Sequence, residues 1–299
     1  MPLPLLPTGQ QDFAELRRTQ RLYVDKTFYV WQLLQQGSIF FFLSRPRRFG
    51  KSLLISLLKC LFEGKQDLFK GLFIYDKIHW QTYPVIHLDF SHMDFKGKGL
   101  WQAINDRLEQ IAAQCKLSFR ETTIGSKFAE LMERMHQQMG NQVVILIDEY
   151  DKPITDALET QHLSQAYLHR DILRQLYSVV KGSSQHIKFF FMTGITRFSK
   201  VSLFSDLNNL TDLTYFSAFH DLLGYTQKEL ESYFAEYLHR LAEQVQLPLE
   251  EVLRQIKRWY NGYSWNGCNQ VYNPYSILRL LESQQFGNYW FESGTPKFL

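Results

Sequence analysis

The sequence predicts an α/β fold built on a parallel, doubly wound sheet. Apolar runs of strand length each lead into a polar loop, and segments with helical periodicity lie between them. Strands that alternate with helices are joined by crossover connections, which are typical of parallel sheets. We expect the strands at residues 39–43, 85–90, 143–147 and 187–192.

Helices are expected where apolar side chains recur at helical spacing and where capping residues begin a segment. Those that alternate with the strands lie at residues 27–36, 53–63, 100–115, 127–138 and 163–181. After about residue 215 only helices are expected, at residues 226–244, 248–260 and 273–282. The chain therefore divides into an N-terminal segment (1–37), an α/β core (38–218) and a small helical or winged-helix domain (219–299).

The first strand runs into a basic loop that ends in Gly50, Lys51 and Ser52, directly before a helix. Strand, loop and helix in this order are the context of a phosphate-binding P-loop. Lys51 would reach the β- and γ-phosphates, and the Ser52 hydroxyl would ligate Mg²⁺. The expected nucleotide-binding residues are Arg45, Pro46, Arg47, Arg48, Phe49, Gly50, Lys51, Ser52 and Leu53.

Arg45 stands where the general pattern G-x-x-x-x-G-K-[ST] has its first glycine. Together with Arg47 and Arg48 it makes the loop strongly cationic, which suits a polyanionic ligand. An arginine does not, however, permit the close backbone approach that glycine permits. Because a Gly-Lys-Ser tripeptide is common by chance, the loop alone would also describe a basic surface turn.

A second strand end favours the nucleotide-binding interpretation. The apolar run 143–147 ends in Asp148 and Glu149, and ligands of open α/β sheets bind at the carboxyl ends of the strands. Asp148 would bind Mg²⁺ or its waters, and Glu149 would polarise the attacking water. The alternative is that these acids only begin a loop or cap the next helix. With both strand ends present, we expect ATP and Mg²⁺ as ligands, with Ser52 and Asp148 holding the metal.

Polar residues also follow the strand at 187–192. In P-loop ATPases whose hydrolytic glutamate follows the second acid, a polar residue on the neighbouring strand often senses the γ-phosphate. Thr193 or Thr196 is therefore expected to be the sensor, and Arg197 is a candidate for stabilising charge in the transition state. Arg197 is equally well explained as a surface arginine, and neither a role within its own subunit nor one on a neighbouring subunit is favoured. With Glu149, these three residues form the expected catalytic set.

The ordered motifs resemble the predicted AAA-type ATPases of bacteria and archaea. The motifs that carry the resemblance span nearly the whole chain, at residues 23–27, 45–52, 146–153, 193–200, 207–214, 223–226, 259–263 and 272–276. In this family Arg45 in place of the first glycine looks usual. The resemblance implies an AAA- and STAND-like P-loop NTPase fold and, usually, a C-terminal PD-(D/E)XK nuclease-like domain. We expect that domain to be absent here, because the chain ends at Leu299.

Length and composition limit the classes of protein to which the chain can belong. A length of 299 residues with 45% hydrophobic content fits a P-loop domain with a small helical one, and the net charge of +3 makes no sequence-wide case for nucleic-acid binding. The three cysteines have no metal-ligand or disulfide spacing. The apolar start is too short and too rich in proline for a signal peptide, and no apolar run is long enough for a membrane span. We expect a cytoplasmic protein that has no membrane partner.

The function that these residues favour is the binding and slow hydrolysis of Mg-ATP, coupled to conformational change. The alternative is an ATP-binding switch or scaffold with little turnover that controls a nuclease-like or other partner. A third reading, nucleic-acid binding, rests on the three arginines of the loop alone. A homo-oligomer and a nuclease-like or nucleic-acid partner are the expected associations.

Two further segments leave alternatives open. Residues 23–27 would either line the adenine pocket or cap the following helix through Asp25 and Thr27. Residues 259–265 are the densest aromatic stretch, and structural anchoring of a turn is favoured there over stacking on a base.

Overall fold

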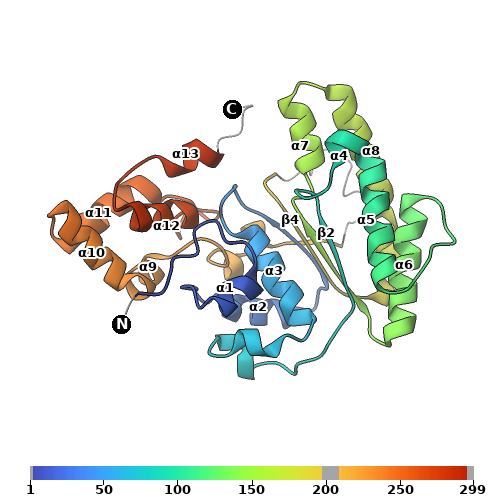
Figure 1. The fold of residues 1–299 in the computed structure, drawn as a ribbon, viewed down its shortest axis with the longest axis horizontal. Coiled ribbons are helices and arrows are strands. Elements are labelled where there is room, and N and C mark those ends of the chain that lie inside the picture. Colours follow the sequence, from blue (N-terminus) through green and yellow to red (C-terminus); the bar gives the residue numbers. More distant parts are fainter. Residues whose placement is uncertain (1–2, 197–208, 295–299) are drawn as a thin grey trace.

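A computed structural model describes residues 3–196 and 209–294 (Figure 1). Within these ranges the strands form one sheet in the order β2-β3-β4-β1-β5. Their bounds are β1 Phe40–Ser44, β2 Val85–Asp89, β3 Val143–Asp148, β4 Ile187–Gly194 and β5 Thr211–Asp212. Every pairing is parallel. The predicted α/β class with a parallel sheet is confirmed, and β5 is a short strand that the apolar pattern did not indicate.

Strand β4 lies between β1 and β3, although it comes last of the three in the chain. Leu43 of β1 therefore pairs in register with Thr193 of β4, and Asp148 of β3 pairs with Asp89 of β2. This order brings the carboxyl ends of β1, β4, β3 and β2 to one edge of the sheet. The loops that carry the basic and acidic motifs start from that edge.

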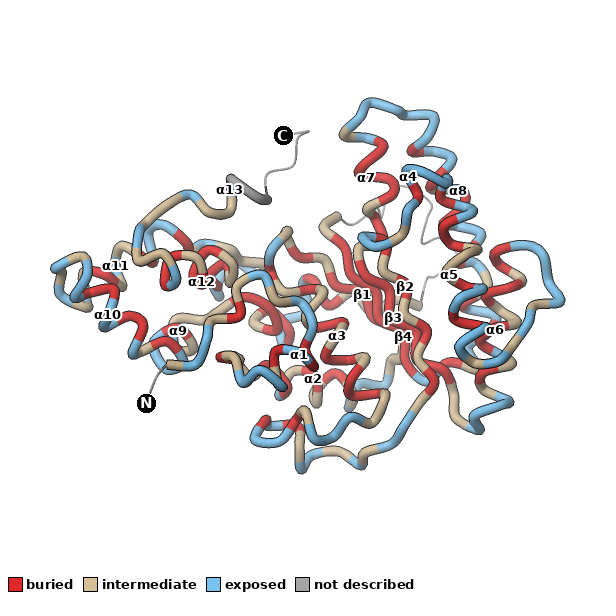
Figure 2. The backbone as a smooth tube through the Cα atoms, viewed as in Figure 1, coloured by how far each residue is buried: buried red, intermediate tan, exposed pale blue. Residues whose placement is uncertain are grey.

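Helices cover both faces of the sheet (Figure 1). One face packs against α1 Phe13–Arg18, α2 Thr27–Leu34 and α3 Lys51–Phe62, and the other packs against α5 Leu100–Gln114, α6 Ile124–Met139 and α8 Leu163–Gly182. Alternate residues of one strand enter opposite cores: Phe40 and Phe42 face the second group of helices, and Phe41 and Leu43 face the first. Strands β1, β3 and β4 are mainly apolar, as expected for strands with both faces buried (Figure 2). In β2, which is an edge strand, buried and half-buried residues alternate.

Further short elements connect these layers. Two α-helices that the sequence pattern did not predict, α4 Phe95–Lys98 and α7 Lys152–Glu159, follow β2 and β3, and both lie close to the functional edge of the sheet. Single turns of 3₁₀-helix occur at residues 66–69, 73–76, 184–186, 213–215 and 217–219.

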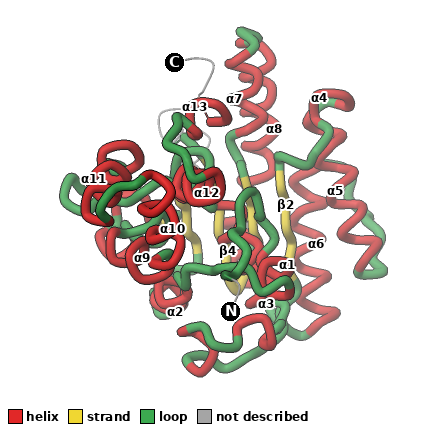
Figure 3. The backbone as a smooth tube through the Cα atoms, turned by 60° about the vertical axis from the view of Figure 1, so that its left-hand side comes forward, coloured by secondary structure: helices red, strands yellow, loops and turns green. Residues whose placement is uncertain are grey.

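The C-terminal region forms a third core beside the sheet (Figure 3). Its helices are α9 Gln227–Tyr233, α10 Ala235–Val245, α11 Leu249–Tyr260, α12 Pro274–Ser283 and α13 Tyr289–Gly294. The single helix predicted over 226–244 is wrong, because Phe234 interrupts it with φ −112° and ψ 14°. The Phe234 ring is fully buried and packs against Tyr225 and Tyr237, so tertiary packing overrides the helical pattern there.

The N-terminal segment contacts both the α/β core and the C-terminal helical region. Leu22 and Val24 enter the C-terminal core, while Phe13 and Val30 enter the core beneath α3. Between them, the buried Lys26 Nζ donates to Glu229 Oε2 and to the Asp221 carbonyl, each at 2.7 Å. None of the helices in the described ranges has the length and apolar character that crossing a bilayer requires.

Candidate functional site

The loop between β1 and α3 has a backbone that few residue types adopt. Arg48 has φ +68° and Gly50 has φ +92°, and α3 begins at Lys51 immediately afterwards. A left-handed residue directly before the first helical N–H groups turns the chain so that those groups face the loop. The result is a helix N-terminus that opens onto a basic loop.

Lys51 lies folded against its own loop. Its Nζ donates to the carbonyl oxygens of Arg45 at 2.9 Å and Pro46 at 3.0 Å, and the residue is buried. Burial lowers the pKa of the Lys51 ammonium, while Glu149, Asp151 and Asp148 raise it. Lys51 is therefore a buried cation that faces three carboxylates across the end of the sheet.

Asp148 is the last residue of β3, and it is buried. Its Oδ1 accepts hydrogen bonds from the Thr193 hydroxyl on β4 and from the Glu149 N–H at 3.1 Å. No residue of the described ranges donates to Oδ2. One oxygen therefore orients the carboxylate, and the other is left for a cation or water.

Glu149 takes the left-handed backbone conformation, with φ +50°. Non-glycine residues are held in this region only when the surrounding structure enforces it, and such residues cluster at functional sites. Burial raises the pKa of the Glu149 carboxyl, and Asp148 raises it further, against the opposing charges of Lys51 and Lys152. The Glu149 carboxylate therefore has a higher proton affinity than an ordinary glutamate, which suits a general base.

Asp151 binds the end of β4. Its Oδ2 accepts from the N–H groups of Ile195 at 2.9 Å and Thr196 at 2.7 Å, and from the Thr196 hydroxyl at 2.6 Å. Burial raises the pKa of this carboxyl, and the hydrogen bonds from Thr196 and the charge of Lys51 oppose that shift. The two candidate sensors therefore differ: Thr193 orients Asp148, and Thr196 holds Asp151.

Gly194 is required by the close packing of this corner. A β-carbon there would lie 2.5 Å from a ring carbon of Tyr150 and 2.8 Å from Asp151 Oδ1. We expect Gly194→Ala to lower the free energy of unfolding by about 1–3 kcal/mol, because overpacking of a rigid site must displace the ring or the carboxylate. Chemical denaturation measures this. Gly182→Ala, where nothing lies within 4 Å of the new carbon, is the control, and equal stability of both variants would contradict the expectation.

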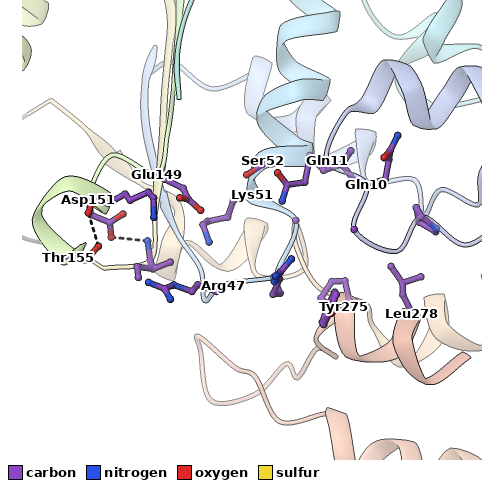
Figure 4. Close-up of a pocket in the computed structure, with 18 of the residues that line it drawn as sticks. Gln10, Gln11, Arg47, Lys51, Ser52, Glu149, Asp151, Thr155, Tyr275 and Leu278 are labelled. Carbon is purple, nitrogen blue, oxygen red and sulfur yellow. Dashed lines mark hydrogen bonds between the residues drawn. The ribbon is translucent and has the colours of Figure 1, made fainter. Parts of the chain in front are cut away.

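Lys51, Ser52, Glu149 and Asp151 line a cavity of about 500 Å³, whereas Asp148 is buried and does not line it (Figure 4). Glu149 and Asp151 lie at one end, and Lys51 and Ser52 lie near the middle. The other end is formed by Gln10 and Gln11 of the N-terminal segment together with Tyr275 and Leu278 of the C-terminal region. Tyr225 and Pro274 of the C-terminal region also line the cavity. The cavity is therefore built by all three parts of the chain.

A family of predicted AAA-ATPases has a sequence model that matches residues 7–204, which is most of the described core. The chain belongs to this family. It is also similar to a curated protein of Azotobacter chroococcum mcd 1, described as an uncharacterized protein in the vnfD 5′ region, with 41% identity over 305 residues. The match covers 98% of this chain and 55% of that protein, so the chain spans about half the length of the curated relative.

Within this AAA-ATPase-like chain, six of the nine expected nucleotide-binding residues line the cavity. They are Arg47, Arg48, Gly50, Lys51, Ser52 and Leu53. Among the expected catalytic residues, Glu149 lines it as well. Thr193 is fully buried behind Asp148, and Thr196 is held by Asp151. Arg197 lies outside the described residues.

Arg45 does not lie where the sequence pattern led us to expect it. Its guanidinium is buried, donates to the Thr214 and Phe219 carbonyls at 3.2 Å, and lies 3.9 Å from the Trp265 ring centroid. Burial lowers the pKa of Arg45 to about 10, although the nearby acids Asp212 and Asp221 and the Tyr215 hydroxyl oppose the shift. Arg45 therefore connects the start of the loop to the segment after β5 and to the C-terminal region.

We expect Arg45→Ala to lower the free energy of unfolding by about 2–4 kcal/mol, because two buried carbonyls lose their donor and the Trp265 ring loses its cation. Arg45→Lys should restore only part of this, since lysine cannot present the planar fork of donors. Denaturant titration checks both variants against Arg18→Ala, which changes an exposed arginine. A loss no larger than that of Arg18→Ala would contradict this structural role.

The aromatic stretch around Trp265 anchors the loop. Phe49 is buried and packs edge to face against Tyr263 at 4.8 Å and Trp265 at 5.6 Å between ring centroids. In the N-terminal segment, Asp25 Oδ1 accepts from the N–H and hydroxyl of Thr27, but the N-cap of α2 is Lys26, which makes no side-chain cap hydrogen bond. Neither Asp25 nor Thr27 lines the cavity. Both segments support the site from outside the cavity.

Sequence reasoning missed several residues that line the cavity. Asp151 lies two residues after Glu149 and was left without a role, although a third acid at a strand end was a visible signal. Tyr225 and Tyr275 belong to motifs that resemble the family, but nothing local to them indicates a ligand. Lys96, Asp156 and Glu159 lie on α4 and α7, two helices that the sequence pattern did not predict.

Proposed function

We propose that the chain binds Mg-ATP in this cavity and hydrolyses it slowly. The observation that carries the proposal is the convergence of Lys51 with Asp148, Glu149 and Asp151 at the carboxyl edge of a parallel sheet, beside a helix N-terminus. Phosphates would lie against the N–H groups of the loop, where backbone donors and Lys51 compensate their charge. The base and ribose would extend toward Gln10, Gln11 and Tyr275, at the opposite end of the cavity.

Ser52 and Asp148 fit a magnesium ion. Ser52 lies in the first turn of α3 and lines the cavity. Asp148 is buried next to the lining residue Glu149, and its Oδ2 accepts no hydrogen bond from the described residues. Hydroxyl, carboxylate and water oxygens are the ligands that Mg²⁺ prefers. When bound, the ion would neutralise charge on the β- and γ-phosphate oxygens. Thr193 would act on this site indirectly by holding the Asp148 carboxylate in one orientation.

Glu149 would act as the general base that polarises the attacking water. Its raised pKa gives the carboxylate a higher proton affinity than an ordinary glutamate has. Lys51 would leave the loop carbonyls that it now contacts and bind phosphate oxygens instead. Asp151 would keep the end of β4 in place beside the γ-phosphate through Ile195 and Thr196.

An ATP-held switch with little turnover is the second candidate. It is favoured by the composition of the cavity, because a nucleotide there would contact the α/β core, the N-terminal segment and α12 together. Such a ligand stabilises the arrangement of those parts in which all its contacts are made. A homo-oligomer or a nuclease-like partner would then read that arrangement. Nucleic-acid binding by the loop is less well supported, because Arg45 is buried, Arg47 pairs with Glu159 and Arg48 lies over Tyr275.

Rapid mixing with labelled Mg-ATP separates the two candidates. Steady phosphate release over many turnovers supports the ATPase. A burst of one phosphate per chain followed by retention of ADP supports the switch. Absence of ATP binding would contradict both.

A further inference from the structure

The cavity holds more cations than the loop motif accounts for. Its cationic lining residues are Arg47, Arg48, Lys51, Lys96 and Lys152. Lys96 is the unexpected one, because it comes from α4 after β2 rather than from the loop or β3. Its side chain is 73% exposed, so the flexible stem has room to move.

Lys96 is paired with Asp156, an acid that also pairs with Lys152. Its Nζ lies 2.8 Å from Asp156 Oδ2, and Lys152 Nζ lies 3.4 Å from Oδ1 of the same carboxylate. Although buried, Oδ2 accepts no hydrogen bond from any residue of the described ranges. The Lys96 contact is thus an ion pair without an aligned hydrogen bond, and one negative charge serves two ammonium groups.

Lys98, on the same helix, gives a direct comparison. Its Nζ donates a hydrogen bond to Asp106 at 2.8 Å, in an exposed pair that does not line the cavity. The two lysines are thus similar in helix, exposure and pair distance. They differ in the alignment of the pair and in access to the site.

We propose that Lys96 is a further phosphate-binding residue, which leaves Asp156 and binds the γ-phosphate when ATP enters the cavity. The inference rests on the proposed nucleotide function and extends it to a residue outside the loop. A terminal phosphate carries more negative charge than a carboxylate shared with Lys152, and its oxygens accept charge-assisted hydrogen bonds. Asp156 then keeps Lys152 as its partner, so the exchange leaves no buried acid without a cation.

Equilibrium binding of Mg-ATP and Mg-ADP to the full chain tests this. Lys96→Gln should weaken ATP binding about tenfold and leave ADP binding within about twofold, because only ATP carries the γ-phosphate. Asp156→Asn should tighten ATP binding about threefold by releasing Lys96. Lys98→Gln and Asp106→Asn are the matched controls and should bind both nucleotides as the wild type does. Lys96→Arg should restore most of the ATP affinity.

Three outcomes would overturn the inference. Wild-type ATP affinity in Lys96→Gln is the first, and equal losses for ATP and ADP are the second. The third is weaker ATP binding in Asp156→Asn at unchanged thermal stability, since this would make Asp156 a support of the site rather than a competitor for Lys96. If ATP binding depends on Lys51 but not on Lys96, the role proposed for Lys96 fails and the proposed ATP-binding function stands. If no Lys51-dependent binding exists, the proposed function fails with it.

Discussion

Replacing Lys51 by alanine is expected to weaken Mg-ATP binding by at least about a hundredfold. Charge-assisted hydrogen bonds are each worth about 1.5–3 kcal/mol, and a lysine at this position would donate to two phosphates. At about 1.4 kcal/mol per tenfold change, two such bonds correspond to a loss of two to four orders of magnitude. Isothermal titration or fluorescent-nucleotide binding measures the effect.

The control for this variant must separate ligand contact from loop structure. Lys51 also donates to the Arg45 and Pro46 carbonyls, so alanine removes an internal support of the loop. Lys51→Met keeps most of the buried stem and removes the ammonium group, with its charge and its hydrogen bonds to the loop. It should lose ATP binding to the same extent, and unchanged thermal stability of this variant would show that the loss comes from the missing ligand contact and not from a disrupted loop. Lys59 lies on the same helix but does not line the cavity, and its Nζ lies 3.9 Å from Glu63 Oε1, in a partly exposed pair that contributes little to stability. Lys59→Ala should therefore bind ATP as the wild type does. Wild-type affinity in Lys51→Met would contradict the role of the charge.

Glu149→Gln should reduce the steady rate of ATP hydrolysis by about two to four orders of magnitude and leave ATP binding nearly unchanged. Loss of a positioned general base has effects of this size, and the amide has the shape of the carboxylate. Because burial and Asp148 raise the Glu149 pKa, the ionised form is lost at a higher pH than in an ordinary glutamate. As the pH decreases, the rate should therefore begin to fall at a pH above the ordinary glutamate pKa of about 4.3.

Phosphate release measured across pH, at saturating ATP, tests both parts of this prediction. Glu133→Gln, an exposed glutamate of α6 that accepts from Gln137, is the matched control and should hydrolyse ATP at the wild-type rate. Turnover in Glu149→Gln at the wild-type rate would remove Glu149 from the mechanism. Loss of binding as well as turnover would instead make it part of the nucleotide site.

Comparison of sequence and structure shows which kinds of residue a linear pattern locates. Strand ends were located to within a few residues, because an apolar run followed by acids is a local signal: β3 ends at Asp148, one residue beyond the predicted range. Lys51 and Ser52 were located because a helix N-terminus after a glycine is also local. Arg45 was not, because its phosphate role was inferred from charge alone, whereas its buried contacts come from Thr214 and Phe219, far along the chain.

The sequence by itself determined the class of fold, the family and the residues that meet at the carboxyl edge of the sheet. These follow from hydrophobic periodicity and short motifs, which need only neighbours in the chain. Only the tertiary structure decided that Arg45 supports the loop, that Phe234 divides a helix and that Lys96 pairs with Asp156 beside the cavity. Each of these depends on which distant groups a side chain meets after folding, and burial and pairing, rather than residue type, determine what a charge or a ring does there.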